Sequence, residues 1–294
     1  EKFEAAGFKV DLQYANNEVA TQVSQIENMI SAGVKVLVIA AIDGKTLTQV
    51  LGTAKEAGIS VIAYDRLIMD TDAVNYYCTF DNYMVGTIQG TYIKDQLKLD
   101  EGGSYNIEIT AGDPADNNAL YFYQGAIDVL QPFIDSGVLT VVSGQTKFEE
   151  VATPAWSTET SQARMEAILA SFYADGTQLD ACLCSNDSTA KGVTNALASS
   201  YTGKYPIVTG QDCDIVNTKD IIAGKQSMSI FKDTRTLAAQ TVTMVSDILA
   251  GKTPETNDNK SYDNGTGIIP TYLCAPVFAD INNYKELLID SGYY

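Results

Sequence analysis

The chain has 294 residues, of which 45% are hydrophobic, so it is long and apolar enough to form two α/β lobes with separate cores. Its 37 acidic residues outnumber its 19 lysines and arginines, and the formal charge of −18 excludes nucleic acid and anionic lipid surfaces as natural partners. There is no histidine, which excludes a Ser-His-Asp triad and most zinc sites and disfavours an enzyme.

Short β-rich runs alternate with helical runs from the N-terminus onward. Lys9–Ala15 is predicted to be a strand, and apolar residues at helical spacing predict a helix over Val19–Ser31. Val34–Ile42 is a continuous apolar run, as expected of a parallel strand buried on both faces. A helix over Thr46–Ala57 and a strand over Ser60–Tyr64 follow.

The same alternation continues to the C-terminus. It predicts parallel sheets with helices on both faces, and the number of repeats favours two lobes. Helices are expected near Asn82–Leu97, Asn118–Ile134, Ser161–Tyr173, Thr189–Ser199, Val216–Ala223 and Thr234–Leu249. Strands are expected near Ser104–Thr110, Leu139–Ser143, Asp180–Ser185, Ile207–Gly210, Ser227–Phe231 and Thr271–Ala279.

The five cysteines are predicted to be buried structural thiols. Most of them lie in apolar strand-like runs, and their odd number disfavours a disulfide framework. Cys182 and Cys184 are too close together for the CxxC spacing of redox and zinc pairs.

Polar side chains follow most of the predicted strands, where parallel sheets bind their ligands. Carboxylate, amide and guanidinium groups can hold sugar hydroxyls in pairs, and an indole can cover the apolar face of a sugar ring. The residues at these strand ends are Asp65, Arg66, Asp113, Asp116, Asn117, Asn118, Trp156, Asn186, Asp187, Gln211, Asp212, Lys232 and Asp233.

Each of these residues also has a structural interpretation. Asp65, Asp187 and Asp233 suit helix N-caps or turns, Asp116–Asn118 suits a turn, and Trp156 could pack a lobe. Two long charged side chains could simply face solvent, Arg66 and Lys232. Their joint placement at the strand ends favours a ligand site.

Eight segments give the chain a family resemblance. It resembles the periplasmic sugar-binding proteins of ABC transporters in the ribose, galactose and xylose group, and is most similar to D-xylose-binding and multiple-sugar-binding members. The resemblance covers essentially the whole chain, and the order and spacing of the segments together are highly specific. They are SQIENMISAGVKVLVIAAIDG (24–44), VIAYDRLI (61–68), TFDN (79–82), GDPADNNA (112–119), SNDSTA (185–190), TGQDCD (209–214), IFKDTR (230–235) and NYKELLIDSGYY (283–294).

The resemblance implies the type I periplasmic binding protein fold, with two Rossmann-like, doubly wound parallel-sheet lobes joined by a three-crossing hinge. The crossings are expected near Phe80–Asp81, Lys232–Asp233 and Gly267–Pro270. The lobes would consist of residues 1–80 with 233–268, and of residues 81–232 with 269–294.

The resemblance also implies the function: capture of one pyranose monosaccharide, such as glucose or xylose, in the interlobe cleft. The lobes would close over the sugar and dock on an ABC transporter permease, and a chemoreceptor is a further partner that the family allows. We expect a monomer with no cofactor, metal or catalytic residue, either periplasmic or held at the cell surface by a lipid anchor. The sugar ligands of the family match Arg66, Asp116, Asn118, Trp156, Asn186, Asp212 and Lys232.

The N-terminus departs from the family pattern. The family begins with a strand and a binding loop before its first helix, whereas Glu1 is expected within that helix, so we expect native residues upstream of it.

Two other functions are open to such a chain. One is the effector domain of a sugar-responsive transcriptional repressor, although neither a helix-turn-helix nor a basic face is visible. The other is an enzyme acting on a sugar, with Asp113 and Asp116 as acid and base.

Overall fold

A computed structural model describes residues 1–294, which divide into two compact units. None of the helices is both long and apolar enough to span a membrane. Residues 269–275, expected in the second lobe, belong to unit 1, so the last crossing follows Ala275 and does not fall near Gly267–Pro270. Unit 1 comprises Glu1–Asp81, Ala115–Asn117 and Asp233–Ala275, and unit 2 comprises Asn82–Pro114, Asn118–Lys232 and Pro276–Tyr294.

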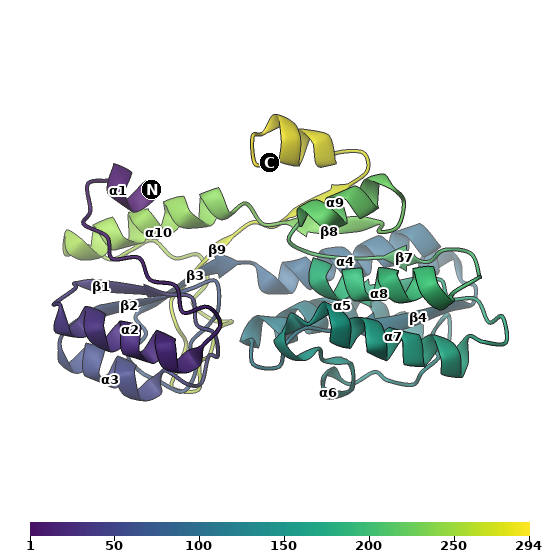
Figure 1. Cartoon of the computed structure of the whole chain (residues 1–294), viewed down its shortest axis with the longest axis horizontal. Helices are drawn as coiled ribbons and strands as arrows, with labels where there is room; N and C mark the ends of the chain where they lie inside the picture. Colours follow the sequence, from purple (N-terminus) through teal and green to yellow (C-terminus); the bar gives the residue numbers. More distant parts are fainter. The chain divides into compact units, whose positions relative to one another are not determined.

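Unit 1 is built on a four-stranded parallel sheet in the order β1-β2-β3-β9. Helices α2 and α3 cover one face of this sheet, and α10 covers the other (Figure 1). The strands are β1 (Val36–Ile39), β2 (Ser60–Tyr64), β3 (Tyr76–Phe80) and β9 (Thr271–Cys274). The helices are α1 (Lys2–Ala5), α2 (Val19–Ser31), α3 (Thr48–Glu56) and α10 (Thr234–Leu249).

Unit 2 contains a second four-stranded parallel sheet, in the order β5-β4-β6-β7, and an antiparallel pair formed by β8 and β10. The strands are β4 (Tyr105–Thr110), β5 (Leu139–Val141), β6 (Ala181–Cys184), β7 (Ile207–Val208), β8 (Met228–Phe231) and β10 (Val277–Asp280). The helices are α4 (Asn82–Leu97), α5 (Asn117–Asp135), α6 (Phe148–Val151), α7 (Thr158–Phe172), α8 (Asp187–Ser200) and α9 (Ile215–Ile222). The remaining elements are two 3₁₀ helices, η1 (Leu99–Glu101) and η2 (Pro154–Trp156), and a π-helix, η3 (Lys285–Asp290).

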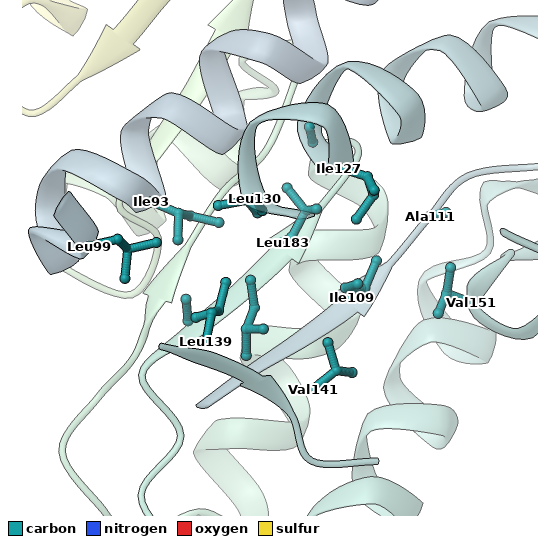
Figure 2. Close-up of a cluster of buried hydrophobic side chains, with 13 residues drawn as sticks. Ile93, Leu99, Ile109, Ala111, Ile127, Leu130, Leu139, Val141, Val151 and Leu183 are labelled. Carbon is teal, nitrogen blue, oxygen red and sulfur yellow. The ribbon is translucent and has the colours of Figure 1, made fainter. Parts of the chain in front are cut away.

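The main core of unit 2 lies between its parallel sheet and helices α4 and α5. Figure 2 shows Ile93 of α4 and Leu130 of α5 in the same buried cluster as Ile109 and Leu183 of the sheet. Full burial of one such aliphatic side chain stabilises the fold by roughly 1.5–3 kcal/mol. A second cluster, which includes Met165 of α7 together with residues of α8 and β6, covers the other face. Helices on both faces fix the sheet and therefore the loops at its strand ends.

Two strand predictions were wrong, and one strand was missed. Lys9–Ala15 is not a strand, because no neighbouring strand pairs with its backbone and its alternate side chains Val10, Leu12 and Tyr14 are exposed. The run Thr271–Ala279 forms two strands, because β9 pairs with β3 while β10 pairs with β8. Strand β3 was not predicted.

The other predicted elements are present with small shifts at their ends. The helix over residues 19–31, the strand over 60–64 and the helices over 82–97 and 234–249 have the predicted bounds. All five cysteines are free and buried, as predicted.

Candidate ligand-binding site

In unit 1, Arg66 follows strand β2 and pairs with Asp116. The Arg66 Nε donates to Asp116 Oδ2 at 3.0 Å, and its Nη1 donates to the carbonyl oxygen of Ile42 at 3.1 Å. Asp116 is only 6% exposed and Arg66 is 29% exposed. A guanidinium held at two of its nitrogens presents its remaining N–H groups in a fixed direction.

The turn before Arg66 is strained and held in place. Asp65 has φ of 63°, which is unusual for a residue with a side chain. Its carbonyl oxygen accepts hydrogen bonds from Tyr77 Oη at 2.7 Å and Thr79 Oγ1 at 2.8 Å. Both hydroxyls come from β3, and both residues are fully buried, so the core of unit 1 fixes the turn that presents Arg66.

In unit 2, Lys232 follows strand β8 and pairs with Asp212. The Lys232 Nζ lies 3.0 Å from Asp212 Oδ1 and 5.6 Å from the centre of the Phe122 ring. The same ring lies 6.2 Å from the Trp156 ring. Lys232 is 14% exposed, so its ammonium lies in a protected position where cation–π attraction is stronger than in open water.

Asn118 lies one helical turn before Phe122 on α5, so the two side chains share a helix face. Its Oδ1 accepts a hydrogen bond from Asn82 Nδ2 at 3.0 Å, and both asparagines are buried. Unit 2 therefore gathers Asn118, Trp156 and Lys232 around Phe122.

Asn186 begins helix α8 as its N-cap. Its Oδ1 accepts a hydrogen bond from the backbone N–H of Thr189 at 3.0 Å. A role as N-cap and a role as ligand are compatible for Asn186, because capping uses the oxygen and leaves the amide nitrogen to donate.

Asp187 and Asp233 have structural roles. Asp233 is an N-cap, as the alternative interpretation allowed, whereas Asp187 is the first residue of α8 and not its cap. Asp187 is fully buried and accepts hydrogen bonds from Gln226 Nε2, Ser229 Oγ and the N–H of Asp214 at 2.8–2.9 Å. Burial raises the pKa of Asp187 well above its usual range. Asp233 caps α10 and pairs with Arg235, which lowers its pKa.

Of the nine non-glycine residues with positive φ, two are predicted ligands and Asp65 directly precedes a third. Besides Asp65, the non-glycine residues Trp156 and Asp212 have positive φ, of 53° and 97°. Such conformations concentrate at ligand sites, where the surrounding structure holds them. Trp156 also lies directly against Gly112, where an added Cβ would be 1.8 Å from the indole Cη2.

The residues that support these predicted ligands were not predicted from the sequence. Phe122, Asn82 and Gln89 all lie inside helices, where a strand-end rule does not look. The one available signal was that Asn82 and Gln89 are polar residues seven positions apart on the buried face of α4.

Each of the two α/β units presents charged hydrogen-bonding side chains after its strands, and unit 2 adds a tryptophan. Such units are typical of the class of proteins that bind small polar molecules. The chain belongs to the family described as periplasmic binding protein domain, whose model matches residues 1–253. It has the type I periplasmic binding protein fold.

Three relatives illustrate this membership. The chain is 50% identical to the multiple sugar-binding periplasmic receptor ChvE of Rhizobium radiobacter, over 100% of this chain and 84% of the relative. It is 36% identical to the D-xylose-binding periplasmic protein of Escherichia coli, again over 100% of this chain and 84% of the relative. The crystal structure of an ABC transporter solute-binding protein from Clostridium phytofermentans with bound β-D-glucose is 68% identical, with a TM-score of 0.97, covering 100% of this chain and 91% of that one.

Proposed function

We propose that this chain is the extracytoplasmic solute-binding protein of an ABC sugar importer, and that it holds one pyranose monosaccharide without changing it chemically. The observation that carries the proposal is a set of preorganised polar side chains in each unit. Unit 1 supplies the pair Arg66 and Asp116, and unit 2 supplies the pair Lys232 and Asp212. The remaining proposed ligands are Asn118, Asn186 and Trp156.

These groups match the chemistry of a sugar. Each hydroxyl both donates and accepts, so a hydroxyl can donate to Asp116 or Asp212 while it accepts from Arg66 or Lys232. A hydrogen bond to a charged group contributes about 1.5–3 kcal/mol, so several of them reach the roughly 8 kcal/mol of a micromolar complex. The indole of Trp156 would cover the apolar face of the ring.

If residues from both units bind the sugar, binding can change the conformation that the permease recognises. A sugar that contacts both units stabilises the arrangement in which both reach it, and an ABC permease can recognise that closed arrangement. The hinge would lie at three of the junctions between the units, Asp81–Asn82, Lys232–Asp233 and Ala275–Pro276. The other two junctions flank the short segment Ala115–Asn117.

The relatives indicate which sugars to test first. One is named for multiple sugars and one for D-xylose, and a solved structure contains β-D-glucose. We therefore propose glucose or xylose as the ligand. The same relatives and the charge of −18 favour transport over a DNA-binding repressor.

The remaining features of the proposal are a monomeric state, a location in the periplasm or on a lipid anchor, the permease as partner and a chemoreceptor as a further partner. Size-exclusion chromatography with light scattering tests the first of these, with a mass near 31.7 kDa expected for this chain.

Titration of sugars against tryptophan fluorescence tests the function, because Trp156 is the only tryptophan. Glucose, xylose, galactose, arabinose and ribose form the panel, and isothermal titration calorimetry provides a second readout. We expect a saturable emission change at micromolar concentration with glucose, xylose or both. No heat, no emission change and no shift in melting temperature with any of the five would refute the proposal.

A separate measurement addresses the enzyme alternative. The NMR spectrum of the bound sugar should stay unchanged after prolonged incubation with stoichiometric protein. New sugar resonances would show turnover and would contradict a pure binding role.

A further inference from the structure

Helix α4 of unit 2 carries a glutamine that we infer to be a positioning residue for the sugar site. Gln89 is fully buried, and its Nε2 donates to two backbone carbonyl oxygens, those of Ser185 at 3.2 Å and Gly210 at 2.9 Å. The inference rests on the proposed function, because its consequence for binding concerns that same site.

The two carbonyls belong to two different binding loops. Ser185 follows β6 and directly precedes Asn186, whereas Gly210 follows β7 and lies two residues before Asp212. One amide nitrogen therefore ties together the loops that carry two proposed sugar ligands. Asp187 and Gln211 reinforce this link, because the N–H of Asp187 donates to the Gln211 carbonyl at 2.9 Å.

The same helix face also supports a third ligand. Asn82 lies seven residues before Gln89, and its Nδ2 donates to Asn118 Oδ1. Between them, Gly86 brings α4 against α5 so closely that an added Cβ would lie 2.0 Å from the Phe122 carbonyl oxygen. One buried face of α4 thus helps to fix the positions of Asn118, Asn186 and Asp212, although no residue of α4 is itself a proposed ligand.

The chemistry of Gln89 fits positioning better than filling of the core. Its Oε1 is buried and accepts no hydrogen bond from the protein. An unsatisfied buried acceptor is unfavourable, so an apolar side chain of the same length would suit a purely structural position better. The two donated bonds are what the glutamine adds, and both end on the binding loops.

The chain provides a matched control at the other end of the same strands. Gln178 precedes β6, and its Nε2 donates to the carbonyl oxygens of Lys204 at 2.9 Å and Leu179 at 2.5 Å. It therefore also ties the segments that flank β6 and β7, but on the side away from the proposed ligands.

The test compares Q89M with Q178M by glucose and xylose titration and by thermal unfolding. We expect Q89M to weaken the affinity about tenfold, the loss expected when charge-assisted and neutral hydrogen bonds from two ligands become misaligned. Q178M should lower the melting temperature and leave the dissociation constant unchanged. Equal affinities for the two variants would overturn the inference. If Q89M does not fold, Q89N serves instead, because its amide is too short to reach both carbonyls.

A double-mutant cycle distinguishes positioning from general destabilisation. If Gln89 acts through Asn186, Q89M should cost much less affinity in an N186A background than in the native protein. A loss of the same size in both backgrounds would contradict the inference.

Hydrogen exchange in the sugar-free protein separates this inference from the proposed function. Q89M should accelerate exchange of the backbone amides of Asn186 and Asp212, whereas Q178M should not. Unchanged exchange would overturn the positioning role even if the native protein binds sugar. Faster exchange in a protein that binds none of the sugars would support the role of Gln89 in holding the loops and refute the proposed function alone.

Discussion

The Arg66 guanidinium donates through Nε to Asp116 Oδ2 at 3.0 Å, and Asp116 is almost completely buried. The pair joins a residue after β2 to one at the start of α5, fifty positions later in the chain. This geometry leads to the first prediction, which is that Asp116 sets the direction of Arg66 in addition to its proposed contact with the sugar.

Replacing Asp116 with Asn should therefore weaken sugar binding by about tenfold to a hundredfold, because the charge-assisted bond is lost and the guanidinium is less firmly held. Isothermal titration calorimetry with glucose and xylose measures the change. Asp72→Asn is the matched control, since it removes the exposed ion pair of Asp72 with Lys55 in the same unit. That control should leave affinity unchanged, and equal effects of the two variants would contradict the prediction.

Gly112→Ala should displace the tryptophan. Gly112 has no positive φ, so alanine is compatible with its backbone, but the new Cβ would lie 1.8 Å from Trp156 Cη2. We expect a shifted emission maximum in the sugar-free protein and a weaker affinity, because the ring would leave the position from which we propose that it covers the sugar. An unaltered spectrum together with native affinity would show that Trp156 does not lie against Gly112.

Gly86→Ala should destabilise unit 2. Its Cβ would meet the Phe122 carbonyl oxygen at 2.0 Å and the Ala126 nitrogen at 2.7 Å, so α4 and α5 would have to separate. Overpacking of this kind lowers the free energy of unfolding by about 1–3 kcal/mol, measurable by urea denaturation. Gly52→Ala, in helix α3 with nothing within 4 Å of its Cβ, should instead raise stability by about 0.5–1 kcal/mol. The same sign for both variants would argue against close packing of α4 on α5.

Ionisation of the buried Asp187 carboxyl should lower the free energy of unfolding as the pH rises from about 4. Burial raises the pKa of this carboxyl in the folded protein, whereas the unfolded chain ionises it near its usual value of about 3.9. Between these two pKa values the folded state binds more protons than the unfolded state, so the free energy of unfolding falls with increasing pH. The stabilising proton is fully present below pH 4 and is lost on passing through the folded pKa.

Urea denaturation from pH 4 to pH 8 measures this effect against the Asp187→Asn variant, which cannot ionise. We expect the free energy of unfolding of the native protein to fall relative to that of the variant, by at most about 1.4 kcal/mol for each pH unit within the window. A difference that stays constant with pH would show that the folded and unfolded pKa values of Asp187 are equal.

The sequence alone determined the βα alternation and the strand ends where ligand groups should gather. Apolar spacing predicted α2, and the βα alternation predicted α4 and α10 with the bounds that the structure shows, because a helix satisfies its backbone hydrogen bonds within its own segment. The same local patterns placed Arg66 and Lys232 directly after buried strands, and the structure pairs each of them with a predicted aspartate.

Only the tertiary structure decided which extended segments are strands and how the site is supported. A strand needs a partner for its backbone groups, so Lys9–Ala15 fails to form one despite its pattern, and Thr271–Ala279 divides between two sheets. Three hydrogen bonds that support the site join residues 36 to 121 positions apart in the chain. One links Asn82 to Asn118, and the other two link Gln89 to the carbonyl oxygens of Ser185 and Gly210. The seven-residue spacing of Asn82 and Gln89 is a local sign that they share a helix face. Their distant partners carry no such sign, because the packing of α4 against the sheet and α5 creates these contacts.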